Sequence, residues 1–402
     1  MRHAGGFPWG LGWALMRGGR GSRRRPTTAR GDPMQRFQQD CVDLARQLHA
    51  RGRLSRRGLI RALSALGAAG ALGAGEARAQ AGKQLVMVNW GGLANEGFGR
   101  FYGEPFMAET PGVKVVQDST GPSTGRIRSM VESGRVTWDL CDSSASGANL
   151  LGKLGLATRL DYSILDRGNV IAPGFALDHG AAPYSFSSVL VYDSAKFPTP
   201  PTSWADFWDL KRFPGTRLLR RDATCTLEAA LMSLGRAPDK LYPIDLRTAI
   251  KRVTELRNNL VFWNNGSESE QLMRTGEAVM GQIWHTRASV LERESKGRIK
   301  FVWNGGILQP GIFVIPKGNP GGELAQRLLA SMLAKPEPQV GLLGLLGNGP
   351  TNPKAAAMVP AELRRFNPTD PENERQQVMI DGAWWGENYQ AGNQDFLDAV
   401  TG

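Results

Sequence analysis

The feature that most constrains this chain is a recurring alternation of apolar, strand-like runs and helical patterns, which begins at residue 85. Residues 85–88 read as a strand buried on both faces, and residues 89–92 (Asn-Trp-Gly-Gly) follow it, where glycine lets the backbone turn sharply. The alternation continues as a helix over 98–109, a strand over 113–116, a helix over 127–132 and a strand over 138–142. Such alternation predicts an α/β fold with a mostly parallel sheet, and ligands bind beyond the carboxyl ends of such strands.

Candidate binding residues follow the predicted strands directly. Trp90 comes after the first strand, and hydroxyl residues follow the second strand (Ser119, Ser123) and the third (Ser144, Ser146). Each feature also has a purely structural interpretation, since the tryptophan can cap the core and the hydroxyls can cap helices. Because the ends of parallel strands meet at one edge of a sheet, we expect these residues to converge on a single crevice.

The net charge of +12 suggests a nucleic-acid or anionic partner, but its distribution argues against one. Residues 1–79 hold 15 Arg, no Lys and 4 acidic residues, whereas residues 80–402 hold 34 basic and 33 acidic residues. The excess charge belongs to the leader. We therefore predict no nucleic-acid partner.

The leader has the features of an export signal. Residues 55–60 (Ser-Arg-Arg-Gly-Leu-Ile) resemble the twin-arginine motif, an apolar stretch covers 59–75, and Ala77-Arg78-Ala79 fits a cleavage site. We predict that residues 1–79 are a signal peptide with a long n-region, for which Met34 is an alternative start. The mature protein would be periplasmic and would use the twin-arginine translocase during export.

The second part of the chain repeats the pattern. Strands are predicted near 189–192, 215–219 and 278–283, and two further strands, 301–303 and 312–315, flank Gly305-Gly306. A second loop with an aromatic and amide residues, 262–267, includes Asn265. Capping boxes are predicted at 203–206 and 267–270.

Taken together, these stretches resemble an extracellular solute-binding protein of an ABC importer, closest to the spermidine/putrescine-binding branch, whose relatives bind opines, phosphonates or thiamine. The matching segments run in order from about residue 85 to 355 and include Val88-Asn89-Trp90, Trp138-Asp139-Leu140, Pro183-Tyr184, Ser203-Trp204-Ala205-Asp206, Ile283-Trp284 and Pro350-Thr351-Asn352. The resemblance implies a two-lobed periplasmic-binding-protein fold of type II. It also implies an ABC permease as partner, a small organic solute as ligand and a monomeric state.

Each lobe would be a mostly parallel sheet flanked by helices, with ligand held between the lobes. We predict a first lobe of 80–190 plus 310–402 and a second lobe of 191–309. Hinge strands would cross near 189–192 and 305–313.

The resemblance also assigns roles. Trp90 matches a stacking tryptophan, Trp284 a second aromatic, Asp222 an acidic residue that pairs with an amine, and Ser144 a hydroxyl. Other positions depart from the polyamine pattern: Gly91-Gly92 and Cys225 replace carboxylates, Gln309 and Gly311 replace an aromatic and an acidic residue, and Ser146 replaces a tyrosine.

These departures disfavour a polyamine, because a buried ammonium without a carboxylate costs several kcal/mol. Arg220 and Arg221 beside Asp222 would suit a ligand with an acid group, although arginines at a strand end are often just solvated. We predict that the ligand-binding residues are Trp90, Gly91, Ser119, Ser123, Ser144, Ser146, Tyr184, Ser185, Asp222, Asn265, Trp284 and Gln309.

The alternative is an exported enzyme or oxidoreductase subunit. After residue 79 the chain has only two histidines, His179 and His285, and no dinucleotide-binding or nucleophile-elbow motif. We expect no catalytic residue, no metal site and no cofactor, and His285 is interpreted as a hydrogen-bonding wall residue. A ferric-iron receptor would need adjacent tyrosines, where the tail has Trp384-Trp385. Whether Cys141 and Cys225 form a disulfide is left open.

Overall fold

The computed structural model describes residues 83–401, so the predicted signal peptide lies outside the described residues. The eleven strands of this part form one sheet, whose main path runs in the order β2-β1-β3-β9-β5-β8-β6-β7. Within residues 83–401, no helix is both long enough and apolar enough to cross a membrane.

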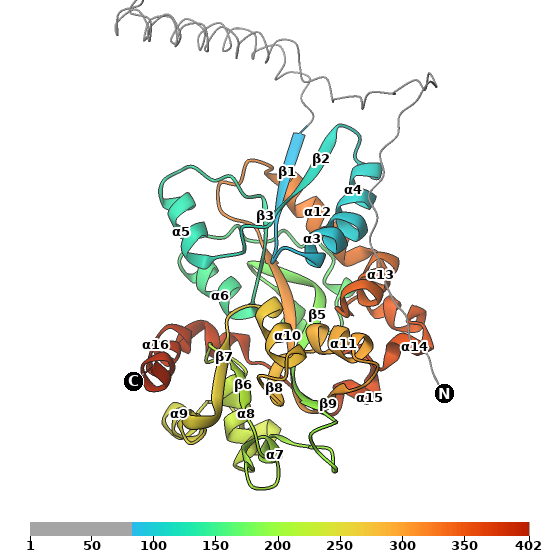
Figure 1. Ribbon diagram of the computed structural model, residues 1–402. Coiled ribbons are helices and arrows are strands. Elements are labelled where there is room, and N and C mark those ends of the chain that lie inside the picture. Colours follow the sequence, from blue (N-terminus) through green and yellow to red (C-terminus); the bar gives the residue numbers. More distant parts are fainter. Residues whose placement is uncertain (1–82, 402) are drawn as a thin grey trace, which may run out of the picture. The chain divides into compact units, whose positions relative to one another are not determined.

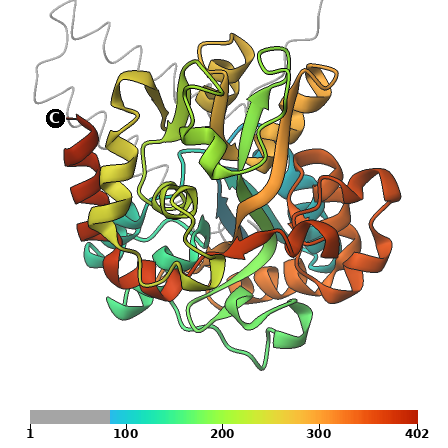
Figure 2. The same ribbon diagram turned by 90° about the horizontal axis from the view of Figure 1, so that it is seen from below.

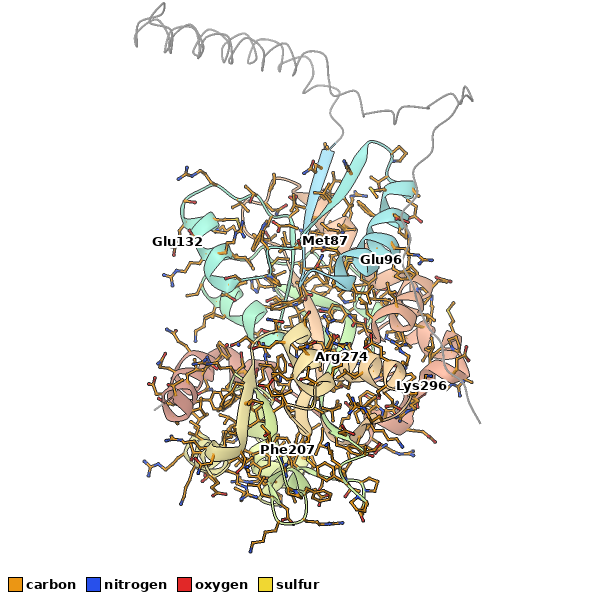
Figure 3. All side chains as sticks on the ribbon, in the orientation of Figure 1. Met87, Glu96, Glu132, Phe207, Arg274 and Lys296 are labelled. Atoms are coloured by element: carbon orange, nitrogen blue, oxygen red, sulfur yellow. The ribbon has the colours of Figure 1, made fainter. Side chains whose placement is uncertain are left out.

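The first half of the fold is built on β1, which pairs in parallel with β2 and β3. Met87, labelled in Figure 3, lies in this half and is fully buried, as expected for a strand covered on both faces. Helices flank these strands (Figure 1). The elements of this half are β1 (Lys83–Val88), α3 (Leu93–Phe98), a π-helical turn (Gly99–Gly103), α4 (Glu104–Glu109), β2 (Val113–Asp118), α5 (Thr124–Glu132), β3 (Leu140–Ser143), α6 (Ala145–Lys153), α12 (Glu323–Ala334) and α13 (Pro336–Leu346).

The second half is built on β6, which pairs in parallel with β7 and β8. Buried apolar residues fill both faces of these strands in two clusters, separate from the cluster of the first half. The elements of this half are α7 (Trp204–Trp208), β6 (Arg217–Arg220), α8 (Thr226–Ser233), α9 (Leu246–Thr254), β7 (Leu260–Trp263), α10 (Gly266–Arg274), β8 (Met280–Trp284), α11 (His285–Glu294), α14 (Ala361–Arg364), α15 (Pro371–Glu374) and α16 (Gly382–Thr401).

Two long strands join the halves, β5 (Gly180–Asp193) and β9 (Ile299–Val314), which pair antiparallel with each other. β9 continues against β3, and β5 continues against β8. The short strands β4 (Ala176–Leu177), β10 (Gly349–Pro350) and β11 (Gln377–Met379) pair with β5 or β9. The predicted two-lobed α/β fold, with mostly parallel sheets joined by long strands, is confirmed. The hinge positions stay a prediction, although both predicted ranges fall on these two strands.

The C-terminal helix α16 packs on both halves, against α6 of the first half and α9 of the second. It buries Trp385 and Phe396 in the core around α8 and α9, and Figure 2 shows it beside α9. The indole Nε1 of Trp385 also donates to Glu228 Oε1, 2.6 Å away. The sequence assigns 310–402 to the first lobe, and the exact lobe limits stay a prediction. A Trp-rich amphipathic helix does not by itself specify which core it covers.

Three local predictions need correction. The first helix begins at Leu93 rather than residue 98, directly after Gly91 and Gly92, whose φ values are 74° and 59°. The predicted capping box at 267–270 is displaced, because Asn265 is the N-cap of α10. In the box at 203–206, the Ser203 side chain makes no cap bond.

The two cysteines among residues 83–401 do not form a disulfide. Cys141 and Cys225 are both free and buried, one in the first half and one in the second. Burial raises the pKa of both thiols well above the usual value, so they are neutral, unreactive core groups.

Candidate functional site

A cavity of about 380 Å³ lies where the strand ends of the two halves meet. β1, β3, β6 and β8 each bring a residue to its wall from their carboxyl ends, as expected for strands that point toward one crevice. Eight of the predicted binding residues line it: Trp90, Ser123, Ser144, Ser146, Tyr184, Asp222, Trp284 and Gln309.

The other four predicted residues lie elsewhere: Gly91, Ser119, Ser185 and Asn265. Ser119 is exposed, while Ser185 is fully buried and donates its hydroxyl hydrogen to the carbonyl of Gly349, 3.1 Å away. Asn265 accepts from the backbone N–H of Glu268 at 3.0 Å. Gly91 supplies the turn that brings Trp90 to the cavity, because its φ of 74° favours glycine.

Two of the predicted hydroxyl residues both cap a helix and line the cavity. Ser123 caps α5 by accepting from the N–H of Arg126, and Ser144 caps α6 by accepting from the N–H of Gly147. Both also line the cavity. Ser144 and Ser146 lie 2.9 Å apart, so one hydroxyl of this pair donates to the other. The caps therefore place polar oxygens and helix N-termini at the same wall.

The aromatic residues form one continuous wall. The ring centroids of Trp90 and Trp284 lie 6.2 Å apart, with the planes tilted by 55°. Phe186 contacts Trp284 edge-on at 6.2 Å, and Trp263 supports it from the core side at 5.0 Å. In this structure the two tryptophans touch each other rather than standing as parallel plates. Trp90 is 50% exposed, so part of its ring is open to solvent.

Arg220 and Asp222 both face the cavity at the end of β6. The guanidinium Nη2 of Arg220 lies 3.7 Å from Asp222 Oδ2. The central guanidinium carbon, Cζ, lies 5.3 Å from the ring centroid of Trp284. Asp222 is already engaged, because its Oδ2 accepts from the Tyr389 hydroxyl at 2.9 Å and its Oδ1 from the Thr224 N–H at 2.9 Å. Arg220 keeps N–H groups for an acidic ligand group. Arg221 is exposed and does not line the cavity.

Asp142 is a cavity residue that sequence reasoning missed. It sits in β3, is fully buried, and lies with Oδ1 and Oδ2 at 3.0 Å and 2.8 Å from the Tyr184 hydroxyl. Burial raises the pKa of this carboxyl to about 8, and hydrogen bonds from Tyr184, the Ser143 backbone and Trp90 offset only part of the effect. Its position at a strand end was the signal that could have identified it.

His285 follows Trp284 but makes no contact with the cavity. Its Nδ1 accepts from the Ser187 N–H at 2.9 Å, so the proton lies on Nε2, which donates to the carbonyl of Gly347 at 2.7 Å. Burial lowers its pKa from 6.5 to about 4. The side chain is a neutral crosslink between β5 and the end of α13 and not a catalytic base.

This crosslink predicts an acid sensitivity. Because the folded pKa lies below the unfolded one, the stabilisation is complete above pH 6.5 and is lost as pH falls toward 4. Between pH 7 and pH 5, wild type should lose about 2 kcal/mol more unfolding free energy than His285→Gln. Urea unfolding of both proteins at the two pH values measures this difference. Parallel pH profiles of the two proteins would show that His285 does not titrate as described.

The chain resembles several known proteins. A family model described as bacterial extracellular solute-binding protein matches residues 102–368. A gamma-aminobutyric acid-binding protein of Pseudomonas aeruginosa is 29% identical over 326 residues, covering 80% of this chain and 92% of that protein.

Two solved structures extend the comparison. An ABC transporter substrate-binding protein from Bradyrhizobium japonicum is 33% identical with a TM-score of 0.74, covering 79% of this chain and 99% of its own. The PBP AgtB from A. tumefaciens, solved in complex with agropinic acid, is 28% identical with a TM-score of 0.71. The match covers 80% of this chain and 99% of that protein. These likenesses span nearly all of each neighbour.

Proposed function

This chain belongs to the bacterial extracellular solute-binding protein family, and from that premise we propose that its ligand is a small organic solute carrying both an amine and an acid group. The protein is a periplasmic substrate-binding receptor of an ABC importer. Receptors of this kind capture a small solute and deliver it to a membrane permease. The family predicted from the sequence is confirmed.

One observation carries the proposal: the cavity holds Arg220, whose guanidinium has N–H groups besides the one facing Asp222, together with the carboxyls of Asp142 and Asp222. An arginine that stacks on an aromatic ring keeps its plane fixed and can bind a carboxylate through two parallel hydrogen bonds. A polyamine has no acid group of its own, so its ammonium groups would face the positive charge of Arg220 without compensation. Relatives named for gamma-aminobutyric acid and agropinic acid, which are small organic acids, support the same direction.

The test compares Arg220→Gln with Arg221→Gln, a matched control one residue away whose side chain is exposed and outside the cavity. The probes are gamma-aminobutyric acid, agropinic acid, glucopine, putrescine and spermidine. We expect at least one acid-bearing probe to raise Tm, because saturation at 100 times Kd adds about 2.7 kcal/mol. Arg220→Gln should lower the affinity for that probe about 10- to 100-fold, since hydrogen bonds to charged groups contribute about 1.5–3 kcal/mol.

Arg221→Gln should bind like wild type. A Tm rise with putrescine or spermidine alone would refute the proposal, and so would equal affinities of wild type and Arg220→Gln for an acid-bearing probe. The first result would mean that Asp142 and Asp222 together accept two ammonium groups despite the positive charge of Arg220 in the same cavity.

We also propose that the protein is non-catalytic, monomeric and exported by the twin-arginine translocase. The receptor role of the family supports the first point. The order of Arg56-Arg57, the apolar stretch and Ala77-Arg78-Ala79 supports the export route. Fusing residues 1–79 to a reporter in cells with and without a functional twin-arginine translocase would test it.

A further inference from the structure

Asp142 differs from the other charged residues at the cavity in having no cationic partner among residues 83–401. The others are paired. The pairs are Arg220 with Asp222 at 3.7 Å, Arg287 with Glu270 at 3.0 Å, and Glu387 with Lys153 at 3.9 Å. A fully buried carboxylate with no cation nearby is costly, so either a proton or an incoming cation must neutralise it.

A neighbour in the same segment shows what a satisfied buried aspartate looks like here. Asp139 is also fully buried, but it accepts from the backbone N–H groups of Val86 at 2.7 Å and Gly321 at 2.6 Å. It does not line the cavity, whereas Asp142 does. Backbone N–H groups therefore satisfy Asp139, whereas Asp142 faces the cavity.

We propose that Asp142 binds the ammonium end of the ligand and that the arriving ammonium expels one proton from its carboxyl group to solvent. This inference rests on the proposed function, because it assigns the amine of an amine-and-acid solute to a specific carboxyl. It also places the two ligand ends on opposite halves of the fold, with the amine on β3 of the first and the acid at Arg220 on β6 of the second. A ligand held this way links the two halves.

The groups around Asp142 are consistent with this exchange. Tyr184, Tyr102 and Cys141 are the titratable groups that interact electrostatically with Asp142, and burial raises the pKa of all three, so they stay neutral near pH 7. Trp90 adds a ring N–H. None of these groups can supply the positive charge that an ionised Asp142 needs.

The proton balance is simple. Without ligand, the carboxyl keeps its proton, and its Oδ2 accepts from the Tyr184 hydroxyl at 2.8 Å. When the ammonium binds, the O–H bond breaks, the proton leaves to buffer, and the carboxylate accepts from the ammonium and from the Tyr184 hydroxyl. The ligand nitrogen keeps its protons and no bond forms to carbon. Affinity for an amine ligand should therefore rise about tenfold per pH unit between pH 6 and pH 7.

The experiment is titration calorimetry with gamma-aminobutyric acid at pH 7 in phosphate and in Tris, whose ionisation enthalpies differ. Wild type should release nearly one proton per ligand bound. Asp142→Asn should release none and bind at least tenfold more weakly, whereas Asp222→Asn, the other cavity aspartate, should still release the proton. Binding by wild type without proton release overturns the proposal, as does release that is lost in Asp222→Asn and kept in Asp142→Asn.

A second arm needs no ligand, which separates this inference from the proposed function. The raised pKa of Asp142 makes the folded state less stable as pH rises toward 8, whereas asparagine does not titrate. The Tm of wild type minus that of Asp142→Asn should fall by a few degrees between pH 6 and pH 8 and then level off. A constant difference overturns the inference even if no probe binds. A falling difference with no binding of any probe would refute the proposed ligand class alone.

Discussion

Gly311→Ala is expected to lower the unfolding free energy by about 3 kcal/mol, because the added methyl group meets a buried ring that cannot give way. A Cβ at this position would lie 2.1 Å from Tyr184 Cζ, far inside contact distance. Tyr184 is opposite Gly311 in the β5–β9 register and packs against Phe98 and Phe313. Relief would require its ring to leave this cluster.

The substitution should also weaken ligand binding about tenfold or more, because a displaced Tyr184 hydroxyl no longer bonds Asp142. Urea unfolding and calorimetry measure the two effects. Gly344→Ala in α13 is the matched control, since its nearest neighbour would be Leu363 Cδ1 at 3.7 Å, and it should be neutral or stabilising.

A double variant tests the cause. Tyr184→Ala alone opens a void, but the void gives the new methyl group at 311 room. Gly311→Ala should therefore cost almost nothing in the Tyr184→Ala background, in contrast to its cost in wild type. Equal costs in the two backgrounds would place the strain elsewhere.

The contact between Gly311 and Tyr184 bears on one departure from the polyamine pattern. The resemblance to polyamine binders implies that Gln309 and Gly311 replace an aromatic and an acidic residue, and from this the sequence analysis predicts a changed ligand. The structure supplies a local reason, because the Tyr184 ring occupies the space over Gly311. Residue 311 must therefore stay small while Tyr184 occupies this position.

Much of the fold followed from local pattern. Apolar runs gave the strands, and Gly91, Ser123 and Ser144 marked their ends, because turn and cap chemistry is local. Eight of the twelve predicted binding residues line the cavity for this reason. Asn265 shows the limit of the approach, since this polar residue in a strand-end loop caps α10 and does not line the cavity.

Long-range contacts could not be predicted from local pattern. The bond from the Tyr389 hydroxyl to Asp222 joins α16 to the end of β6 across 167 residues, and it occupies the carboxylate that the sequence assigned to an amine. Only the packing of α16 on the second core brings the two together. Asp142 was missed for a related reason, because a buried aspartate in a strand does not reveal whether backbone amides or a ligand will satisfy it.

Arg217→Met is expected to cause the largest loss of stability, about 4 kcal/mol, without removing any residue of the cavity wall. Arg217 is fully buried, and its guanidinium donates to three carbonyls: Nε to Phe207 at 2.6 Å, Nη1 to Gly215 at 2.9 Å, and Nη2 to Phe213. Phe207, labelled in Figure 3, is fully buried. Methionine fills part of the volume but leaves all three carbonyl oxygens without a donor.

Burial lowers the pKa of Arg217 to about 10, so it stays charged at neutral pH and is stabilised by carbonyl dipoles. Lysine carries the same charge but lacks the planar fork, so Arg217→Lys should recover only a minor part of the loss. Arg221→Met, at the exposed end of the same segment, should change the unfolding free energy by less than about 0.5 kcal/mol. Urea unfolding of the three variants measures these differences.

Measurements of ligand affinity distinguish variants that destabilise the fold from variants that damage the binding site. At a temperature where Arg217→Met is still folded, its affinity for an acid-bearing probe should stay within about twofold of wild type, because the guanidinium does not line the cavity. Arg220→Gln should show the reverse, weak binding with little loss of stability. A large affinity loss in Arg217→Met would mean that its carbonyl bonds also set the position of Arg220, three residues further along the same strand.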